Sequence, residues 1–143
     1  MALGTTYDPD NIFAKIIRGE LPAIKIFEDE DALAFMDIFP QSRGHTLVIP
    51  KKAQATNFLD ANAEDLSALI GRVQHVAKGV VKALNPDGVR VMQFNGAPAG
   101  QTVFHLHFHI IPIFEAEEMK RHAGEKADMA KLEELAKKIS AAI

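Results

Sequence analysis

The sequence has no cysteine. That absence excludes disulfides, thiolate metal sites and cysteine nucleophiles. No apolar run approaches the roughly 20 residues that a membrane span needs, and residues 1–11 lack a basic segment followed by an apolar core, so we expect neither a membrane partner nor a signal peptide. Neither sign of charge dominates, since 16 Lys and Arg face 19 Asp and Glu and leave a net charge of −3. A broad basic surface for nucleic acid is therefore not expected, and a cytoplasmic enzyme or binding protein remains.

What the sequence does contain suits one folded domain. Its 143 residues predict a single domain, 1–143, and its 48% of hydrophobic and 24% of charged residues are ordinary for a globular protein. A chain of this length buries roughly 68% of its unfolded surface, which is enough for one core. From residue 115 onward the sequence turns polar and helical, so we expect a C-terminal helical tail over residues 115–143.

Hydrophobic periodicity predicts both helices and strands. Apolar residues at helical spacing predict a short helix capped by Asp10, a long helix that begins at Asn62 and ends at Leu84, and an amphipathic helix in the tail. The acidic run 28–31 is interpreted as a solvated turn between the first two strands. Strands are predicted over residues 24–27, 33–36, 46–49, 89–94 and 102–113. Because some of them are joined as hairpins, we expect an α+β fold, a five-stranded antiparallel sheet with helices packed on it.

The most informative segment is His105-Leu106-His107-Phe108-His109-Ile110-Ile111. Side chains of a strand point to alternate faces, so the three histidines would share one face, ~6.6 Å apart at a rise of ~3.3 Å per residue. The apolar residues between them would take the opposite face and anchor the strand in the core. Residues 91–114 contain no Asp, Glu, Lys or Arg. No carboxylate of this segment would therefore repel a phosphate.

Three interpretations of this row remain open from the residues alone. The histidines could be satisfied structural side chains, although imidazole is neither a strong core residue nor a typical strand former. A His-x-His pair could hold zinc with a third ligand from elsewhere, but three successive alternate positions do not readily converge on one small ion. A neutral imidazole could attack phosphorus if an acceptor holds its second nitrogen, while the flanking imidazoles donate to phosphate oxygens.

The segment is similar to the motif of the histidine triad (HIT) family, His-φ-His-φ-His-φ-φ with φ apolar. Every apolar position is filled, by Leu106, Phe108, Ile110 and Ile111. Together with earlier blocks at residues 12–17, 19–22, 33–38 and 44–51, the resemblance covers a core of about 11–114. It implies a HIT-like fold whose sheets join across a two-fold homodimer. The predicted helix 62–84 is the candidate for that contact, because its apolar face is broader than packing against its own sheet requires.

The resemblance also implies a role for each matching residue. His107 would be the nucleophile, with its second nitrogen held by the main-chain carbonyl of His105. His109 and His45 would orient it and contact the phosphate, and Asp37 would bind the ribose hydroxyls. The other matches would line the base pocket (Ile12, Phe13, Ile16, Phe35 and Ile38) or lie near the phosphate and leaving group (Asn95, Gln101 and Thr102).

Other features qualify that assignment. On its pattern alone, Asp37 could cap a turn, and Phe13, Ile16 and Phe35 could be plain core. Thr102 stands where Hint-like phosphoramidases usually have serine. Threonine keeps the hydroxyl of serine and adds a methyl group. The cysteines that bind a structural zinc in some bacterial members are absent, so no metal is expected. His75 and His122 fall outside the motif and are interpreted as surface or structural residues.

The activity implied by the resemblance is hydrolysis or transfer at the α-phosphorus of a purine nucleotide through a nucleotidyl-histidine intermediate. AMP or a similar monophosphate would be a product, and no cofactor would be needed. Purine nucleoside phosphoramidates are the first expectation for the substrate, and dinucleoside polyphosphates of the Ap4A type are the alternative. A nucleotide-binding regulatory dimer with incidental hydrolysis and a zinc hydrolase remain open as other classes.

Overall fold

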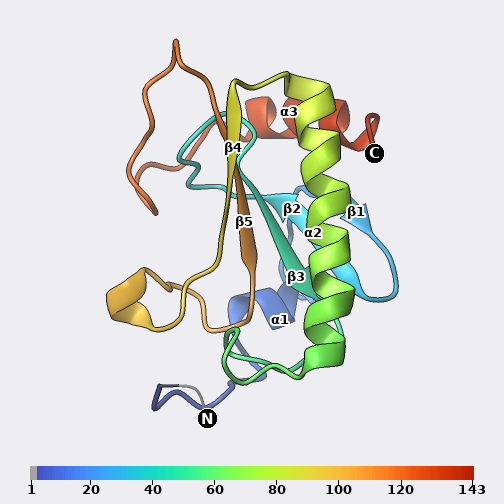
Figure 1. Ribbon diagram of the computed structural model, residues 1–143, viewed down its shortest axis with the longest axis vertical. Coiled ribbons are helices and arrows are strands. Elements are labelled where there is room, and N and C mark those ends of the chain that lie inside the picture. Colours follow the sequence, from blue (N-terminus) through green and yellow to red (C-terminus); the bar gives the residue numbers. More distant parts are fainter. Residues whose placement is uncertain (1–2) are drawn as a thin grey trace.

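A computed structural model describes residues 3–143, in which five antiparallel strands form one sheet (Figure 1). The strand order is β1-β2-β3-β5-β4, so β1 and β4 are the two edges of the sheet. The strands are β1 (Lys25–Glu28), β2 (Ala32–Met36), β3 (Thr46–Pro50), β4 (Gly88–Met92) and β5 (Phe108–Ile113), and the helices are α1 (Ile12–Ile17), α2 (Ala63–Leu84), the 3-10 helix η1 (Ala97–Ala99) and α3 (Met129–Ser140). The expected α+β fold with a five-stranded antiparallel sheet is confirmed.

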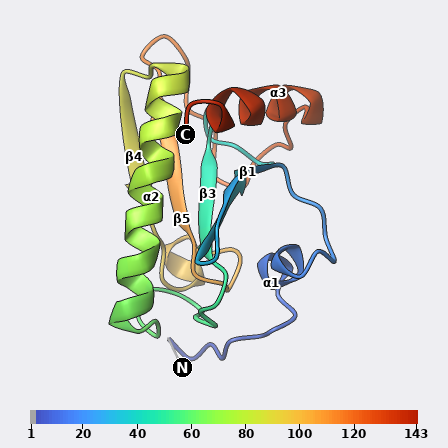
Figure 2. The same ribbon diagram turned by 90° about the vertical axis from the view of Figure 1, so that its right-hand side faces the viewer.

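Helices cover both faces of the sheet, with α2 and α1 on opposite sides (Figure 2). The main core lies under α2 and α3 and includes Ala34, Val48, Val76, Val80 and Leu132. A smaller core lies under α1 and contains Phe13, Ile16, Leu33, Phe35, Leu47 and Ile49. Because both faces are covered, every residue of β2 and β3 is buried.

The long helix α2 has the boundaries that its sequence predicts. The side chain of Asn62 accepts a hydrogen bond from the backbone N–H of Asp65, and Asn85 ends the helix in the left-handed conformation at φ 48°. Its predicted apolar face is only partly used within the chain. Leu69 is 1% exposed, whereas Ile70 and Val81 remain 50% and 43% exposed.

Two local expectations near the N-terminal half are wrong. Asn11, not Asp10, caps α1, because it is the Asn11 side chain that accepts the N–H of Ala14 at 2.9 Å. The acidic turn is also more than a solvated loop. Arg72 on α2 donates to Asp29 and Asp31 at 2.9 Å each, so the turn is pinned to the helix that covers the sheet.

The predicted strand over residues 102–113 is too long, since β5 begins only at Phe108. β3 and β5 pair no further than Val48 with Phe108. Beyond that point the backbone N–H of Leu106 donates to the carbonyl of Ala55 at 2.8 Å, and the carbonyl of Pro50 is taken by the side chain of His105 at 3.1 Å. Loop and side-chain partners therefore replace the ladder, and only His109 of the three histidines lies within a strand.

The polar tail contains the helix that its periodicity predicts. In α3, Asp128 is the N-cap, and Leu132, Ala136 and Ile139 are buried against the main core. Residues 114–128, between β5 and α3, form no helix and loop out beside β4 and β5, on the left in Figure 1. None of the helices in residues 3–143 is long and apolar enough to cross a membrane.

The burial pattern of two leucines gives a stability test. Leu69 on the inner face of α2 is 1% exposed, while Leu59 in the preceding loop is 58% exposed. We expect Leu69→Ala to lower the free energy of unfolding by about 2–5 kcal/mol, because it loses buried apolar surface and leaves a cavity. Leu59→Ala should change it by less than about 0.5 kcal/mol. Urea unfolding at one protein concentration measures both, and equal effects would contradict the described core.

Candidate active site

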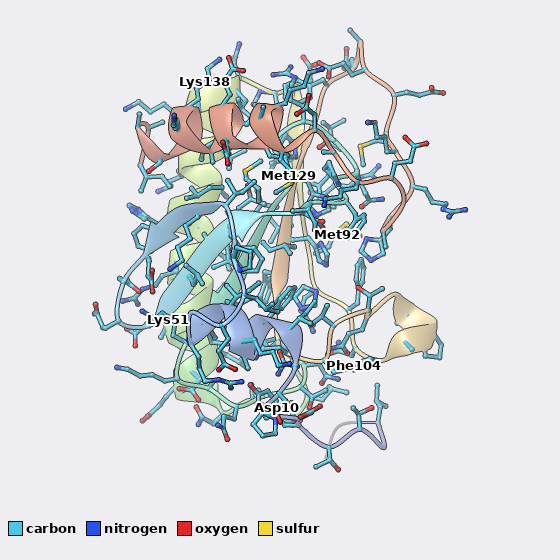
Figure 3. The ribbon with its side chains drawn as sticks, turned by 180° about the vertical axis from the view of Figure 1, so that it is seen from behind. Asp10, Lys51, Met92, Phe104, Met129 and Lys138 are labelled. Atoms are coloured by element: carbon cyan, nitrogen blue, oxygen red, sulfur yellow. The ribbon has the colours of Figure 1, made fainter. Side chains whose placement is uncertain are left out.

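The histidines of the motif lie on the sheet face that α1 covers, since the rings of His105 and His107 both contact Phe13 of that helix. Figure 3 shows this face of the sheet, with α1 in the foreground. His109 is paired across the sheet with Leu47, a residue of the smaller core under α1. Leu106 and Ile110 belong instead to the main core on the opposite face. The ring centroids of His107 and His109 are 5.0 Å apart. The predicted alternation therefore holds, although residues 105–107 precede the strand.

His107 is held in the form that a nucleophile needs. Its Nδ1 is 2.6 Å from the carbonyl oxygen of His105, so Nδ1 carries the proton and donates it. The lone pair of the neutral ring is then on Nε2. The side chain is only 6% exposed, and burial lowers its pKa, which keeps the ring unprotonated. A basic, oriented nitrogen is therefore present at neutral pH.

A chain of hydrogen bonds fixes the protonation of two further histidines. The backbone N–H of Gln41 donates to Nδ1 of His45 at 3.0 Å, so the proton of the neutral His45 ring is on Nε2. That Nε2–H donates to Nδ1 of His109 at 2.9 Å. The proton of His109 is consequently on its Nε2, which is enclosed and has no hydrogen-bond partner in residues 3–143. An N–H donor thus remains available beside His107.

His105 supports the site rather than opening onto it. Its Nε2–H donates to the carbonyl of Pro50 at 3.1 Å, and its Nδ1 accepts from the hydroxyl of Tyr7 at 2.9 Å. Both ring nitrogens are therefore occupied, and the backbone carbonyl that holds His107 is fixed in place. Tyr7 was not among the predicted site residues, because a single tyrosine in a polar N-terminal segment gives no sequence signal.

Burial controls the charge of the whole group. Desolvation lowers the pKa of His45 to about 4, of His105 to about 4 and of His109 to about 2. All three rings are neutral at pH 7, so they offer an anion oriented N–H dipoles rather than positive charge. The arrangement is suited to stabilising charge that develops during a reaction.

Asp37 combines the two roles that its sequence allows. Its Oδ1 accepts the backbone N–H of Phe39 at 2.8 Å, which caps the turn, and its Oδ2 is 3.4 Å from Nε2 of His45. Asp37, His45 and His109 offer ligand atoms that all lie within 4.8 Å of one another, as a metal site would need. A metal there would have to displace the proton that His45 donates to His109.

The predicted base-pocket residues are only partly brought together. Phe13 and Phe35 are in edge contact, with ring centroids 5.3 Å apart, and the ring centroid of Phe13 is 5.0 Å from that of His107. Ile16 is buried in the same cluster. Ile12 is half exposed beside them. Ile38 packs instead against the main core on the other face of the sheet.

The predicted residues of the phosphate and leaving-group side also differ among themselves. The amide of Gln101 is buried and bonds to Asn57, Gly96, Thr56 and Val103, so it clamps loops together. The Oδ1 of Asn95 accepts from the N–H of Phe58 and from the side chain of Gln93 at 3.0 Å each. Thr102 is exposed. Sequence matching found this loop but could not separate its structural residues from free ones.

His122 is a member of the cluster that the sequence did not reveal. Its ring centroid lies 5.4 Å from that of His109 and 5.5 Å from that of Phe94, and its Nε2–H donates to the carbonyl of Gly100 at 3.2 Å. Of the two expectations for His122, a surface residue or a structural one, the structure favours the second, because the ring is partly buried and packed. A lone histidine in a polar segment has no periodicity or motif that could have indicated this position.

Comparisons with known proteins agree with this geometry. The HIT domain model matches residues 18–116. A solved structure of a Hit-like protein involved in cell-cycle regulation from Bartonella henselae is 53% identical, with a TM-score of 0.91 over 97% of this chain and 100% of that one. The adenosine 5′-monophosphoramidase of Schizosaccharomyces pombe is 44% identical over 71% of this chain and 72% of its own. The adenylylsulfatase of Arabidopsis thaliana is 37% identical over 83% of this chain and 63% of its own.

The buried neutral histidines predict acid sensitivity of the fold. In the unfolded chain each ring takes up a proton near its ordinary pKa of about 6.5, whereas the folded chain resists protonation until much lower pH. The stability that the folded chain gains from these neutral rings is therefore complete above pH 6.5 and is lost as the pH falls toward about 4. Each histidine contributes a slope of about 1.4 kcal/mol per pH unit.

Urea unfolding at pH 7, 6 and 5 measures this dependence. We expect the free energy of unfolding to fall steeply over that range, and His105→Gln to reduce the slope by about one histidine's share. A free energy that stays constant between pH 7 and 5 would contradict the burial of neutral rings.

Proposed function

Because this chain belongs to the HIT (histidine triad) family, whose members are generally nucleotide hydrolases, we propose that it is a purine nucleoside phosphoramidase. The proposed reaction takes place at the α-phosphorus and passes through a nucleotide covalently attached to His107. The observation that carries the proposal is the hydrogen bond from Nδ1 of His107 to the carbonyl of His105, which leaves a lone pair on Nε2.

The proposed first step forms one bond and breaks one. The Nε2 lone pair of His107 attacks the α-phosphorus, the bond from phosphorus to the leaving nitrogen breaks with its electron pair going to nitrogen, and the departing amine takes up a proton from its surroundings. Water then attacks the phosphorus of the adduct, the bond to Nε2 breaks, and a nucleoside monophosphate is released. The ring of His107 returns to its starting tautomer because the carbonyl of His105 holds the Nδ1 proton throughout.

Neighbouring groups support the charge distribution that this chemistry requires. The free Nε2–H of His109 is a donor for a non-bridging phosphate oxygen, on which negative charge increases in the transition state. Residues 91–114 carry no Asp, Glu, Lys or Arg, so no carboxylate of the segment opposes the phosphate. The rings of His45, His105 and His109 are themselves almost fully buried, so water has little access to them.

The sides of the site are assigned to different parts of the substrate. Asp37 keeps lone pairs on Oδ2 that suit the ribose hydroxyls, and Phe13 and Ile12 beside His107 suit an apolar purine. The proposal assigns the phosphate and leaving group to the loop of Asn95, Gln101 and Thr102, whose shape Gln101 holds. The similarity to an adenosine 5′-monophosphoramidase and to an adenylylsulfatase supports an adenylyl group as the part of the substrate that is retained.

A dinucleoside polyphosphate of the Ap4A type is the second candidate substrate, because it shares everything except the leaving group. The other alternative is a regulatory dimer that binds AMP and whose slow hydrolysis of nucleotides is incidental. The leaving group distinguishes the substrates, and the turnover rate distinguishes enzyme from regulator.

The test compares wild type with His107→Ala on adenosine 5′-phosphoramidate and diadenosine polyphosphates. We expect kcat/KM to fall at least about 1,000-fold in the variant, because the covalent route is closed, while AMP affinity stays within about three-fold. His75→Ala is the matched control, since His75 is exposed on α2 and its ring touches Phe27 at 5.2 Å. Its kinetics should equal those of wild type.

Two results would contradict the proposal. A His107→Ala variant with near-normal turnover would remove the covalent role of this ring. Activity that disappears in excess chelator and returns with stoichiometric zinc would favour a metal hydrolase at Asp37, His45 and His109 instead. We expect full activity in excess chelator.

We further propose that two copies form the expected two-fold homodimer through β4 and α2. β4 is an edge of the sheet with its outer backbone groups open, and Val91 on it is 46% exposed. Ile70 and Val81 on α2 extend this apolar surface. Sheets that join edge to edge would satisfy the open backbone groups and cover these side chains.

Sedimentation measures this assembly directly. We expect wild type to have the mass of two chains, and Val91→Lys to sediment as one chain, because a charge would be buried at the contact. Leu21→Lys, at a 38% exposed position in the loop after α1, should remain dimeric. A monomeric wild type would contradict the interface.

A further inference from the structure

The segment between β5 and α3 is tied to the two loops that carry site residues. The backbone N–H of Lys120 donates to the carbonyl of Gln41 at 2.7 Å, and Arg43 bonds to Glu117 at 2.9 Å. His122 bonds to the carbonyl of Gly100 in the loop that follows β4. In Figure 1 this segment descends from the top of β5 on the side of η1. It therefore bridges the loop of His45 and the loop of Asn95 to Gln101.

Three rings meet where this segment reaches the histidine row. The ring centroid of His109 is 5.1 Å from that of Phe94 and 5.4 Å from that of His122, and the centroids of Phe94 and His122 are 5.5 Å apart. Because the Nε2–H of His122 donates to the carbonyl of Gly100, the lone pair of the neutral ring is on Nδ1. Gly100 presents that carbonyl at φ 109°, a conformation that favours glycine, and a Cβ there would touch the ring of Phe94 at 3.4 Å.

Two complementary nitrogens in this group have no partner. The Nε2–H of His109 is a donor and the Nδ1 of His122 is an acceptor, and both atoms are enclosed without a hydrogen bond to any of residues 3–143. Buried unpaired polar atoms are costly and uncommon in folded proteins. The two nitrogens do not bond to each other, so each is open to a group from outside the chain. The Nε2–H of His109 suits a phosphate oxygen, as proposed above, which leaves the Nδ1 of His122 for another group of the substrate.

An imidazole nitrogen without a partner among the described residues of the chain can give a proton to a reacting group and take one back. On this basis we propose that His122 is a fifth histidine of the active site, whose Nδ1 exchanges the proton with the leaving amine and then with the attacking water. The inference rests on the function proposed above. It assigns the proton that the covalent steps require but that His107, with its Nδ1–H bonded to His105, does not supply.

The proton balance closes over one turnover. The cycle begins with His122 as an imidazolium, which has taken a proton on Nδ1 while Nε2–H stays on the carbonyl of Gly100. In the first step, Nε2 of His107 bonds to phosphorus, the bond from phosphorus to nitrogen breaks, and Nδ1 of His122 gives its proton to the departing amine. In the second step, water bonds to phosphorus and the bond from Nε2 to phosphorus breaks. The proton of that water goes to Nδ1 of His122, which restores the starting state. No further reactant is needed.

A permanently bound water that bridges His109 and His122 is the competing explanation. Such a water would make His122 a structural residue only. The two explanations differ in how a change at His122 depends on the leaving group.

The experiment uses two substrates with the same adenylyl group. Adenosine 5′-phosphoramidate needs a proton on its leaving nitrogen, whereas the 4-nitrophenyl ester of AMP releases a stable anion. The variant His122→Gln keeps an N–H for the carbonyl of Gly100 but cannot exchange protons at neutral pH. His122→Asn is the second variant, so that the comparison survives if one of them folds poorly.

We expect His122→Gln to lower kcat/KM at least about 100-fold for the phosphoramidate and less than about 3-fold for the ester. The contrast arises because kcat/KM for the ester reports only adduct formation, in which no proton is transferred. With the ester, the adduct on His107 should accumulate in the variant, because the attacking water has lost its proton acceptor. Intact mass after rapid quenching in alkaline denaturant detects it.

Equal losses on the two substrates, or no loss on either, would overturn the role of His122 and leave the proposed function intact. The His107→Ala variant separates the two proposals, because it should form no adduct with either substrate. If wild type forms no adduct with the ester, the proposed function fails and the inference about His122 fails with it. Circular dichroism and AMP affinity establish that each variant retains the native site.

Discussion

The site depends on one hydrogen bond between residues two positions apart. The Nδ1–H of His107 donates to the carbonyl of His105 at 2.6 Å, and this contact decides which nitrogen of the ring has a lone pair. The carbonyl is available because residues 105–107 have left the sheet ladder, so no neighbouring strand uses it. A strand that continued from residue 108 back to residue 102 would have paired its backbone groups across the sheet. The irregular backbone is therefore a condition for the orientation of His107.

Burial keeps the histidines of the site uncharged. A cluster of five histidines could carry several positive charges, but desolvation lowers the pKa of His45, His105, His107 and His109. Protons are then placed by hydrogen bonds to the backbone, beginning with the N–H of Gln41 and ending at the free Nε2–H of His109. Backbone groups do not titrate, so the donors and acceptors of the site keep their orientation at neutral pH. The same burial makes the fold vulnerable to acid.

The polar tail has two parts with different roles. α3 contributes Leu132, Ala136 and Ile139 to the main core and so completes the cover of the sheet. The segment before it brings His122 to Phe94 and His109. One connection thereby links the main core, the loop of Gln41 and the loop of Gly100. Stability and site geometry are coupled in this region of the chain.

The sequence by itself determined the elements and the histidine row, because periods of 2 and 3.6 residues are local properties that burial on one face imposes on a chain. It was sufficient for the α+β class, the extent of α2 and the placement of His105, His107 and His109 on one face. Only the tertiary structure decided where the strand of His109 begins, that Gln101 clamps loops, that Ile38 packs on the other face, and that Tyr7 and His122 join the cluster. Those outcomes depend on contacts between residues far apart in the chain, such as Tyr7 with His105 and His122 with Gly100, and no local pattern records a partner that folding alone brings near.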